Sequence, residues 1–101
     1  MTSYLKESPY RSKAWLQAVA SLPCVICFRE GATQAAHVNH RGKGMGMKAP
    51  DVWTFPACIT CHHEFDFGMK YTKQQRRELA DEWVIQTIHA LAKAGKLKVS
   101  A

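Results

Sequence analysis

Two Cys-x-x-Cys segments, Cys24 to Cys27 and Cys58 to Cys61, constrain this chain of 101 residues more than any other feature. At this spacing one tight turn can offer two thiolates to a single metal ion. A chain this short builds one modest core, and small domains often need a metal or a disulfide for stability. The two segments therefore predict one four-cysteine site that holds one structural Zn²⁺ per chain.

Two other chemistries use the same spacing. A redox dithiol needs only one such pair and usually lies in a βαβ setting. The segment from Cys58 to His62 also matches the attachment motif of c-type haem, but covalent haem requires export and would leave Cys24 and Cys27 without a role. Four thiolates leave no open coordination position, so we expect a structural and not a catalytic zinc ion.

The charge of the chain favours a polyanionic partner. Its 14 Lys and Arg residues exceed its 8 Asp and Glu residues, and nucleic acid is the commonest such partner. No apolar stretch resembles a secretory signal, and no run approaches the ~20 apolar residues of a membrane span. We therefore expect one cytoplasmic domain over residues 1–101, in a reducing compartment where cysteines bind metal.

Two helices are expected to flank the core of this α+β domain. Ser12 is a typical N-cap residue, and the apolar spacing after it predicts a helix over 12–22. Thr72, with Gln75 three residues later, is typical of a capping box at the start of a helix over 72–94.

The core, residues 24–67, is expected to contain two strands and a short helix. The strands are predicted over 33–38 and 52–55, and Pro56 is expected to end the second one. The helix is predicted over 60–67, and the glycine-rich, basic segment 39–51 predicts a loop between the strands.

His62 and Asp66 are candidate metal ligands. Their four-residue spacing places both side chains on one face of the short helix, where they can share a second metal ion. His63 lies about 100° away from His62 around the helix and is expected to be exposed. The cysteine segment and the residues after it therefore predict a structural metal site and a reactive one on adjacent parts of one helix.

His37 is the candidate general base. It ends a predicted strand just before a glycine-rich loop, a place where active-site residues often lie. His40, three residues later, is the alternative candidate. His89, alone on the long helix, is expected to have no catalytic role.

The features follow in this order: a Cys-x-x-Cys segment, a strand that ends in His, a loop with glycines and basic residues, an Asp before a second strand, and a Cys-x-x-Cys-His segment that leads into a helix. In this order the chain resembles the HNH endonuclease superfamily, whose core is a ββα-metal finger. It is similar to the four-cysteine branch of that superfamily and to small nucleases of phages and prophages. The resemblance covers about residues 24–66. Its most specific parts are Ala36-His37, Lys48-Ala-Pro-Asp51 and Cys58-Ile-Thr-Cys61-His62-His-Glu-Phe-Asp66.

The resemblance implies roles for four residues. The family's general base falls on His37, and Asp51 takes the position of the central Asn, which holds the loop and orients the base. His62 and Asp66 take the positions of ligands to a catalytic divalent metal. Mg²⁺ or Mn²⁺ suits a site of this kind, because both accept oxygen ligands and keep bound water.

Two departures from the family pattern concern the same site. Many members have a further metal ligand just before the general base, where this chain has Ala36. Asp51 replaces the usual Asn, and it stands seven residues before Cys58, a wider gap than usual.

Basic residues are expected to bind the phosphate backbone. Three of them, Arg41, Lys43 and Lys48, share the glycine-rich loop, whose exposed amides add further donors. A second cluster opens the long helix and either follows DNA or forms a solvated face: Lys70, Lys73, Arg76 and Arg77.

The expected activity is metal-dependent endonucleolytic cleavage of DNA with weak sequence specificity. His37 would activate water for in-line attack, and the family's products are 5′-phosphate and 3′-hydroxyl ends. A double-strand cut would need two copies or a protein partner. The alternative is a non-catalytic, zinc-stabilised module that binds nucleic acid or protein and needs neither His37 nor the pair of His62 and Asp66.

Overall fold

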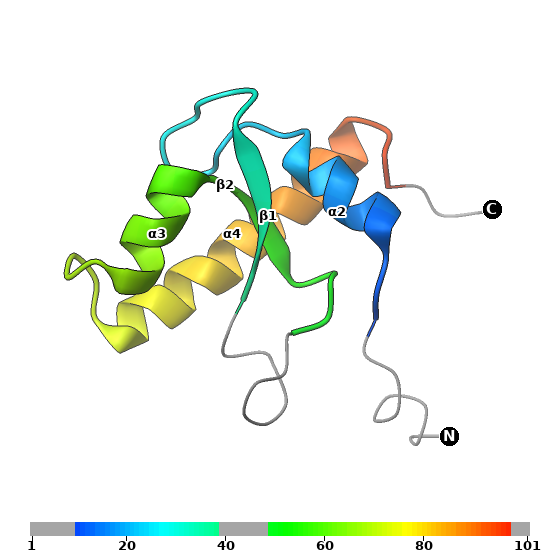
Figure 1. Cartoon of the computed structure of the whole chain (residues 1–101). Helices are drawn as coiled ribbons and strands as arrows, with labels where there is room; N and C mark the ends of the chain where they lie inside the picture. Colours follow the sequence, from blue (N-terminus) through cyan, green and yellow to red (C-terminus); the bar gives the residue numbers. More distant parts are fainter. Residues whose placement is uncertain (1–9, 39–48, 98–101) are drawn as a thin grey trace, which may run out of the picture.

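The computed structural model describes residues 10–38 and 49–97 and has an α+β architecture (Figure 1). The elements follow in the order α2 (Lys13–Ala20), β1 (Thr33–His37), β2 (Thr54–Cys58), α3 (Ile59–Phe67) and α4 (Lys73–Lys93). In Figure 1, α4 crosses behind the two strands, with α3 near its first turns and α2 near its last. The predicted α+β class is confirmed.

The strands β1 and β2 form an antiparallel sheet. Their register runs from Thr33 opposite Cys58 to His37 opposite Thr54. One more bond extends the ladder beyond His37, because the Val38 N–H donates to the Trp53 carbonyl at 3.0 Å. The sheet thus places His37 at one end and Cys58 at the other.

The prediction for the second strand was wrong in its position. β2 spans Thr54–Cys58 and includes Pro56, which was expected to end it. The Pro56 carbonyl accepts a 2.9 Å hydrogen bond from Val25, outside the two-stranded ladder. Because the nitrogen and carbonyl of a strand residue point to the same side, the missing N–H of Pro56 removes no bond to β1.

The core lies where the sheet meets α3 and α4. A two-stranded sheet is marginal by itself, so it needs packing against these helices. Phe55 of β2, Phe65 of α3 and Trp83 of α4 pack together, with ring centroids 4.9 to 6.1 Å apart. Ala36 and Val38 are buried in the same cluster. This packing fixes α3 and α4 against the end of β1.

The predicted helix ends are largely confirmed. The Ser12 hydroxyl accepts from the Trp15 N–H at 3.1 Å, and α2 ends at Ala20, two residues earlier than expected. Thr72 and Gln75 form the full capping box at the start of α4. Gly95 follows α4 with φ of +76°, a conformation that favours glycine.

None of the helices in the described part of the chain combines enough length with enough apolar character to cross a bilayer.

Candidate functional site

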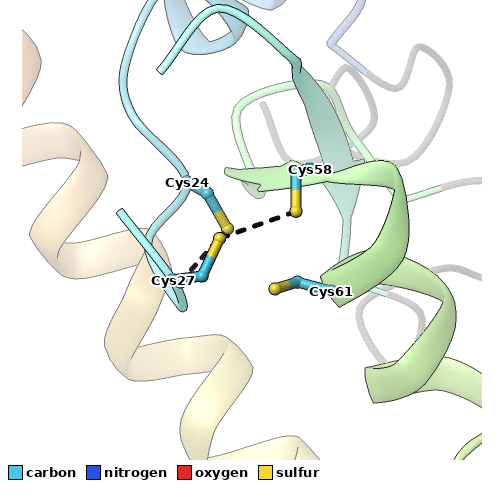
Figure 2. A group of neighbouring side chains, drawn as sticks. All are labelled: Cys24, Cys27, Cys58 and Cys61. Atoms are coloured by element: carbon cyan, nitrogen blue, oxygen red, sulfur yellow. Dashed lines mark hydrogen bonds between the residues drawn. The ribbon is translucent and has the colours of Figure 1, made fainter. Parts of the chain in front are cut away.

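The four cysteines come together at the end of the sheet (Figure 2). All four Sγ atoms lie within 4.8 Å of one another, and the Sγ atoms of Cys27 and Cys58 are 3.7 Å apart. Tetrahedral zinc with bonds of about 2.3 Å separates its sulfur ligands by about 3.8 Å. The cluster therefore fits a metal ion such as zinc, in agreement with the sequence prediction.

A tight turn shapes the first half of this cluster. Cys24 Sγ accepts from the N–H groups of Ile26 at 3.4 Å and Cys27 at 3.5 Å. The turn closes with the Phe28 N–H donating to the Cys24 carbonyl at 2.8 Å, and Phe28 adopts φ of +65°. The Val25 N–H anchors the turn on Pro56 of β2. Most of these bonds are local, which is why the spacing alone predicts the site.

The second half of the cluster begins α3. Cys58 is the last residue of β2 and the N-cap of α3, and Cys61 lies in the first turn of that helix. The positive end of a helix dipole favours thiolates in this position. Metal binding here would therefore fix both the start and the direction of α3.

The four thiols differ in acidity. Burial raises the pKa of Cys24, but backbone N–H donors, that of Cys27 first, outweigh it and lower this pKa to about 6. The Cys61 backbone N–H lowers the pKa of Cys58, while burial raises the pKa of Cys61 itself. Each Cys-x-x-Cys segment thus has one thiol with a lowered pKa, Cys24 or Cys58. A bound cation would stabilise the thiolate form of the other two cysteines as well.

At the other end of the sheet, His37 is paired with Asp51. The Nε2 atom of His37 lies 2.8 Å from Asp51 Oδ1, and the Asp51 side chain is buried. The Asp51 carbonyl also accepts from the Thr54 hydroxyl at 2.8 Å, which ties this residue to the start of β2. The structure therefore brings together the two residues predicted as base and orienting group.

Asp51 also joins the chain before α2 to the sheet. Its Oδ2 accepts from the Ser12 N–H at 2.8 Å, and the Arg11 guanidinium lies 3.3 Å from Oδ1. Burial raises the pKa of Asp51, but the bonds from His37 and Ser12 and the nearby Arg11 outweigh it and hold this pKa below its usual value. Asp51 is therefore a carboxylate at neutral pH.

The third pair lies on α3. His62 Nε2 and Asp66 Oδ2 are 3.2 Å apart, as expected for residues one turn apart on a helix. Both side chains are partly exposed, whereas His63 is exposed. The prediction that His62 and Asp66 lie on one face of this helix is therefore confirmed.

A pocket of about 310 Å³ connects these groups. It is lined by His37 at the end of β1 and by Asp66 on α3, and its remaining wall comes mainly from the core and from α4. The α4 part of the lining contains the side chains of Lys73, Arg76, Arg77 and Ala80. Asp51 and His62 are not part of the lining and reach it through their partners, His37 and Asp66.

Some expected site residues lie outside the described part of the chain. These are the alternative base and the three basic loop residues, His40, Arg41, Lys43 and Lys48. His89 is exposed on α4, away from the residues that line the pocket.

Sequence reasoning missed two features of the site. The role of Arg11 and Ser12 as partners of Asp51 has no local signal, because 39 or more positions separate them. The placement of Lys73, Arg76 and Arg77 in the pocket had a partial signal in their three- and four-residue spacing, which the sequence alone left undecided.

Comparisons with known proteins extend this description. A search of the curated proteins and a search of the solved structures each found no match. The model of a family described as protein of unknown function (DUF968) matches residues 3–87, which is most of the chain and includes every residue of the two sites. The protein therefore belongs to the DUF968 family.

Proposed function

We propose that the protein is a metal-dependent endonuclease of the HNH type that hydrolyses phosphodiester bonds in DNA. One observation carries this proposal: a single pocket holds His37, paired with Asp51, and Asp66, paired with His62. The net charge of +6 favours the polyanionic substrate.

The order of the elements agrees with this proposal. Two antiparallel strands lead directly into a helix, with His37 at the end of β1 and His62 on α3. This is the ββα arrangement that the resemblance to HNH nucleases implies. The four-cysteine cluster at the junction of β2 and α3 would stabilise the finger without taking part in the reaction.

His37 has the arrangement that a general base needs. With its Nε2 proton donated to Asp51, the imidazole keeps a lone pair on Nδ1 that can accept a proton from water. The resulting hydroxide would attack phosphorus, and the bond to the 3′ oxygen would break as that oxygen takes up a proton from solvent. Asp51 would orient the ring and stabilise its protonated form.

His62 and Asp66 would hold the catalytic cation. Their 3.2 Å separation is close to the roughly 3.0 Å between neighbouring ligands of octahedral Mg²⁺ with bonds of about 2.1 Å. A divalent cation there supplies charge neutralisation for the phosphate and for the leaving oxygen. Ala36 is 1% exposed and contributes no ligand, and in the described residues no third acid, His or Cys completes the pair. Water or phosphate oxygens would fill the other positions.

A non-catalytic module that binds nucleic acid is the second candidate. The observation in its favour is the network around Asp51, which joins Ser12, Arg11 and His37 and would also stabilise the fold without any reaction. Under this alternative, His62 and Asp66 form an ordinary ion pair on a helix surface.

Nicking of supercoiled plasmid DNA separates the two candidates. Zinc-loaded wild-type protein should convert the plasmid to open circles with Mg²⁺ or Mn²⁺, and His37→Ala should slow this by about 10² to 10⁴ fold. His89→Ala is the matched control, because His89 is exposed and far from the pocket lining.

Absence of nicking by folded, zinc-loaded wild-type protein with either metal would refute the enzyme and leave the binding module. Equal nicking by His37→Ala and wild type would instead refute the assignment of His37 as the base.

A further inference from the structure

The pocket beside His37 has a basic wall that neither the fold nor the zinc site explains. Lys73, Arg76 and Arg77 all line it, and all three come from the first two turns of α4. Their three- and four-residue spacing puts them on neighbouring parts of one helix face. The buried residues of α4, among them Ala80 and Trp83, hold that face against the pocket.

The position of these cations is unfavourable for the helix itself. The first turns of a helix carry the positive end of its dipole, where acidic residues stabilise and basic residues destabilise. The first turn of α4 contains no acidic residue. The capping box of Thr72 and Gln75 already binds N–H groups at this terminus, so the side chains, rather than the helix end, are the groups offered to a ligand.

The charges in the pocket are unbalanced. Asp66 is the only carboxylate in its lining, and it is paired with His62. Across residues 10–38 and 49–97, none of Lys73, Arg76 and Arg77 forms an ion pair with a carboxylate. Arg76 donates to the Tyr71 carbonyl at 3.4 Å, a neutral partner that positions the guanidinium without cancelling its charge. Three cations therefore face one carboxylate.

We propose that Lys73, Arg76 and Arg77 bind the phosphodiester backbone of a DNA strand in this pocket. A volume of about 310 Å³ is small for a ligand site and suits a short backbone segment rather than a whole nucleotide pair. The inference rests on the proposed function in one respect only, which is the position of the scissile phosphate near His37 and Asp66. The α4 cations would hold the strand through its phosphates, without reading its bases.

The test measures binding rather than cleavage. Fluorescence anisotropy of a labelled 20-mer, as duplex and as single-stranded DNA, gives the dissociation constant at a series of NaCl concentrations without added divalent cation. The full, zinc-loaded chain is compared with the triple variant Lys73→Gln/Arg76→Gln/Arg77→Gln. The matched control, Lys13→Gln/Arg29→Gln/Lys93→Gln, removes the same charge from exposed positions outside the pocket.

The wild-type affinity should fall steeply with salt. Each lost phosphate contact reduces the slope of log K against log[salt] by about 0.9 for duplex and about 0.7 for single strands, so the pocket variant should lose about 2 to 3 units. At 0.1 M NaCl it should bind at least about tenfold more weakly, whereas the control should change much less. Arg77→Gln alone, at an exposed position, should lose about one unit and serves if the triple variant does not fold.

Equal losses in the pocket variant and the control, or no binding of either DNA form by wild type, would overturn the inference. Pocket-dependent binding by a protein that never nicks DNA would refute the proposed function and leave this inference standing. Nicking by a protein whose DNA affinity does not depend on the pocket charges would refute this inference and leave the proposed function standing.

Discussion

The cysteine cluster and the His37 pocket share helix α3 but are built in different ways. Cys58 and Cys61 lie at the start of this helix, His62 follows directly, and Asp66 lies one turn later. All four thiols of the cysteine cluster come from two short segments, Cys24 to Cys27 and Cys58 to Cys61. The pocket instead draws on β1, α3 and α4, and its His37 side chain is hydrogen-bonded to Asp51 from the loop between the strands.

This difference indicates separate tasks for two adjacent sites. The cysteine cluster offers four soft donor atoms, which would leave a bound metal ion no open position for a substrate. The pocket is lined by one candidate metal ligand, Asp66, which is paired with His62, and by the candidate base His37 and three basic side chains. Changes in the cysteine cluster should therefore unfold the molecule, whereas changes in the pocket should remove activity and leave the fold and the bound zinc intact.

The largest effect is expected for Cys58→Ser. Cys58 is 1% exposed and lies where β2 ends and α3 begins, and its side chain makes no cap hydrogen bond, so Cys58→Ser acts by removing a metal ligand at this junction. Structural zinc contributes about 10–16 kcal/mol of binding free energy, as much as the whole stability of a small domain. The variant should show no cooperative thermal transition by circular dichroism and no stoichiometric zinc.

Thr60→Ala is the control for this change, because Thr60 is exposed between the two cysteines of the same turn. A cooperatively folded Cys58→Ser protein of near wild-type stability would contradict a structural role for the metal.

Asp66→Asn should remove cleavage without unfolding the protein. Loss of a metal ligand and its charge costs several kcal/mol of transition-state stabilisation, or at least about 100-fold in nicking rate. Glu64→Gln, at an exposed position on the same helix, should leave the rate unchanged. Loss of zinc from Asp66→Asn would show that the two sites are not separate.

Asp51→Asn should destabilise the protein by about 1–3 kcal/mol, since it leaves partly buried donors without a charged acceptor. The pKa of the Asp51 carboxyl is lower in the folded protein than in the unfolded chain, where it lies near 3.9. The resulting stability is present above the unfolded-state pKa and is lost only as the pH falls through the lower folded-state pKa. Urea unfolding should therefore give the same difference from wild type at pH 8 and at pH 9. A difference that shrinks between these values would show that Asp51 titrates there.

The smallest effect is expected for Thr72→Ala, which removes the capping box of α4. An N-cap substitution of this kind costs about 1 kcal/mol. Urea unfolding should detect this loss, while zinc content stays at the wild-type level. A change in zinc content would mean that the start of α4 supports the cysteine cluster as well as the pocket.

The sequence predicted the parts of the molecule that depend on local chemistry. The Cys-x-x-Cys spacing predicted the cluster, and Ser12 and Thr72 marked the helix starts, because each signal and its hydrogen bonds lie within a few residues. The pairing of His62 with Asp66 follows in the same way from helix periodicity.

Tertiary contacts decided the rest. The sequence pattern predicts that Pro56 ends the strand, but Pro56 lies within β2. It fits there because its carbonyl points away from β1 and accepts a hydrogen bond from Val25. Whether Lys73, Arg76 and Arg77 face solvent or a pocket depends on how Trp83 and Phe65 dock α4 against α3, which no local pattern gives.

The most direct test of the account is a titration of zinc-loaded wild-type protein with Mg²⁺, with plasmid nicking and zinc per chain measured on the same samples. Nicking should rise from near zero as Mg²⁺ is added, while about one zinc stays bound to each chain. No nicking at any Mg²⁺ concentration, or full nicking before Mg²⁺ is added, would contradict a structural cysteine site next to a separate, metal-dependent cleavage pocket.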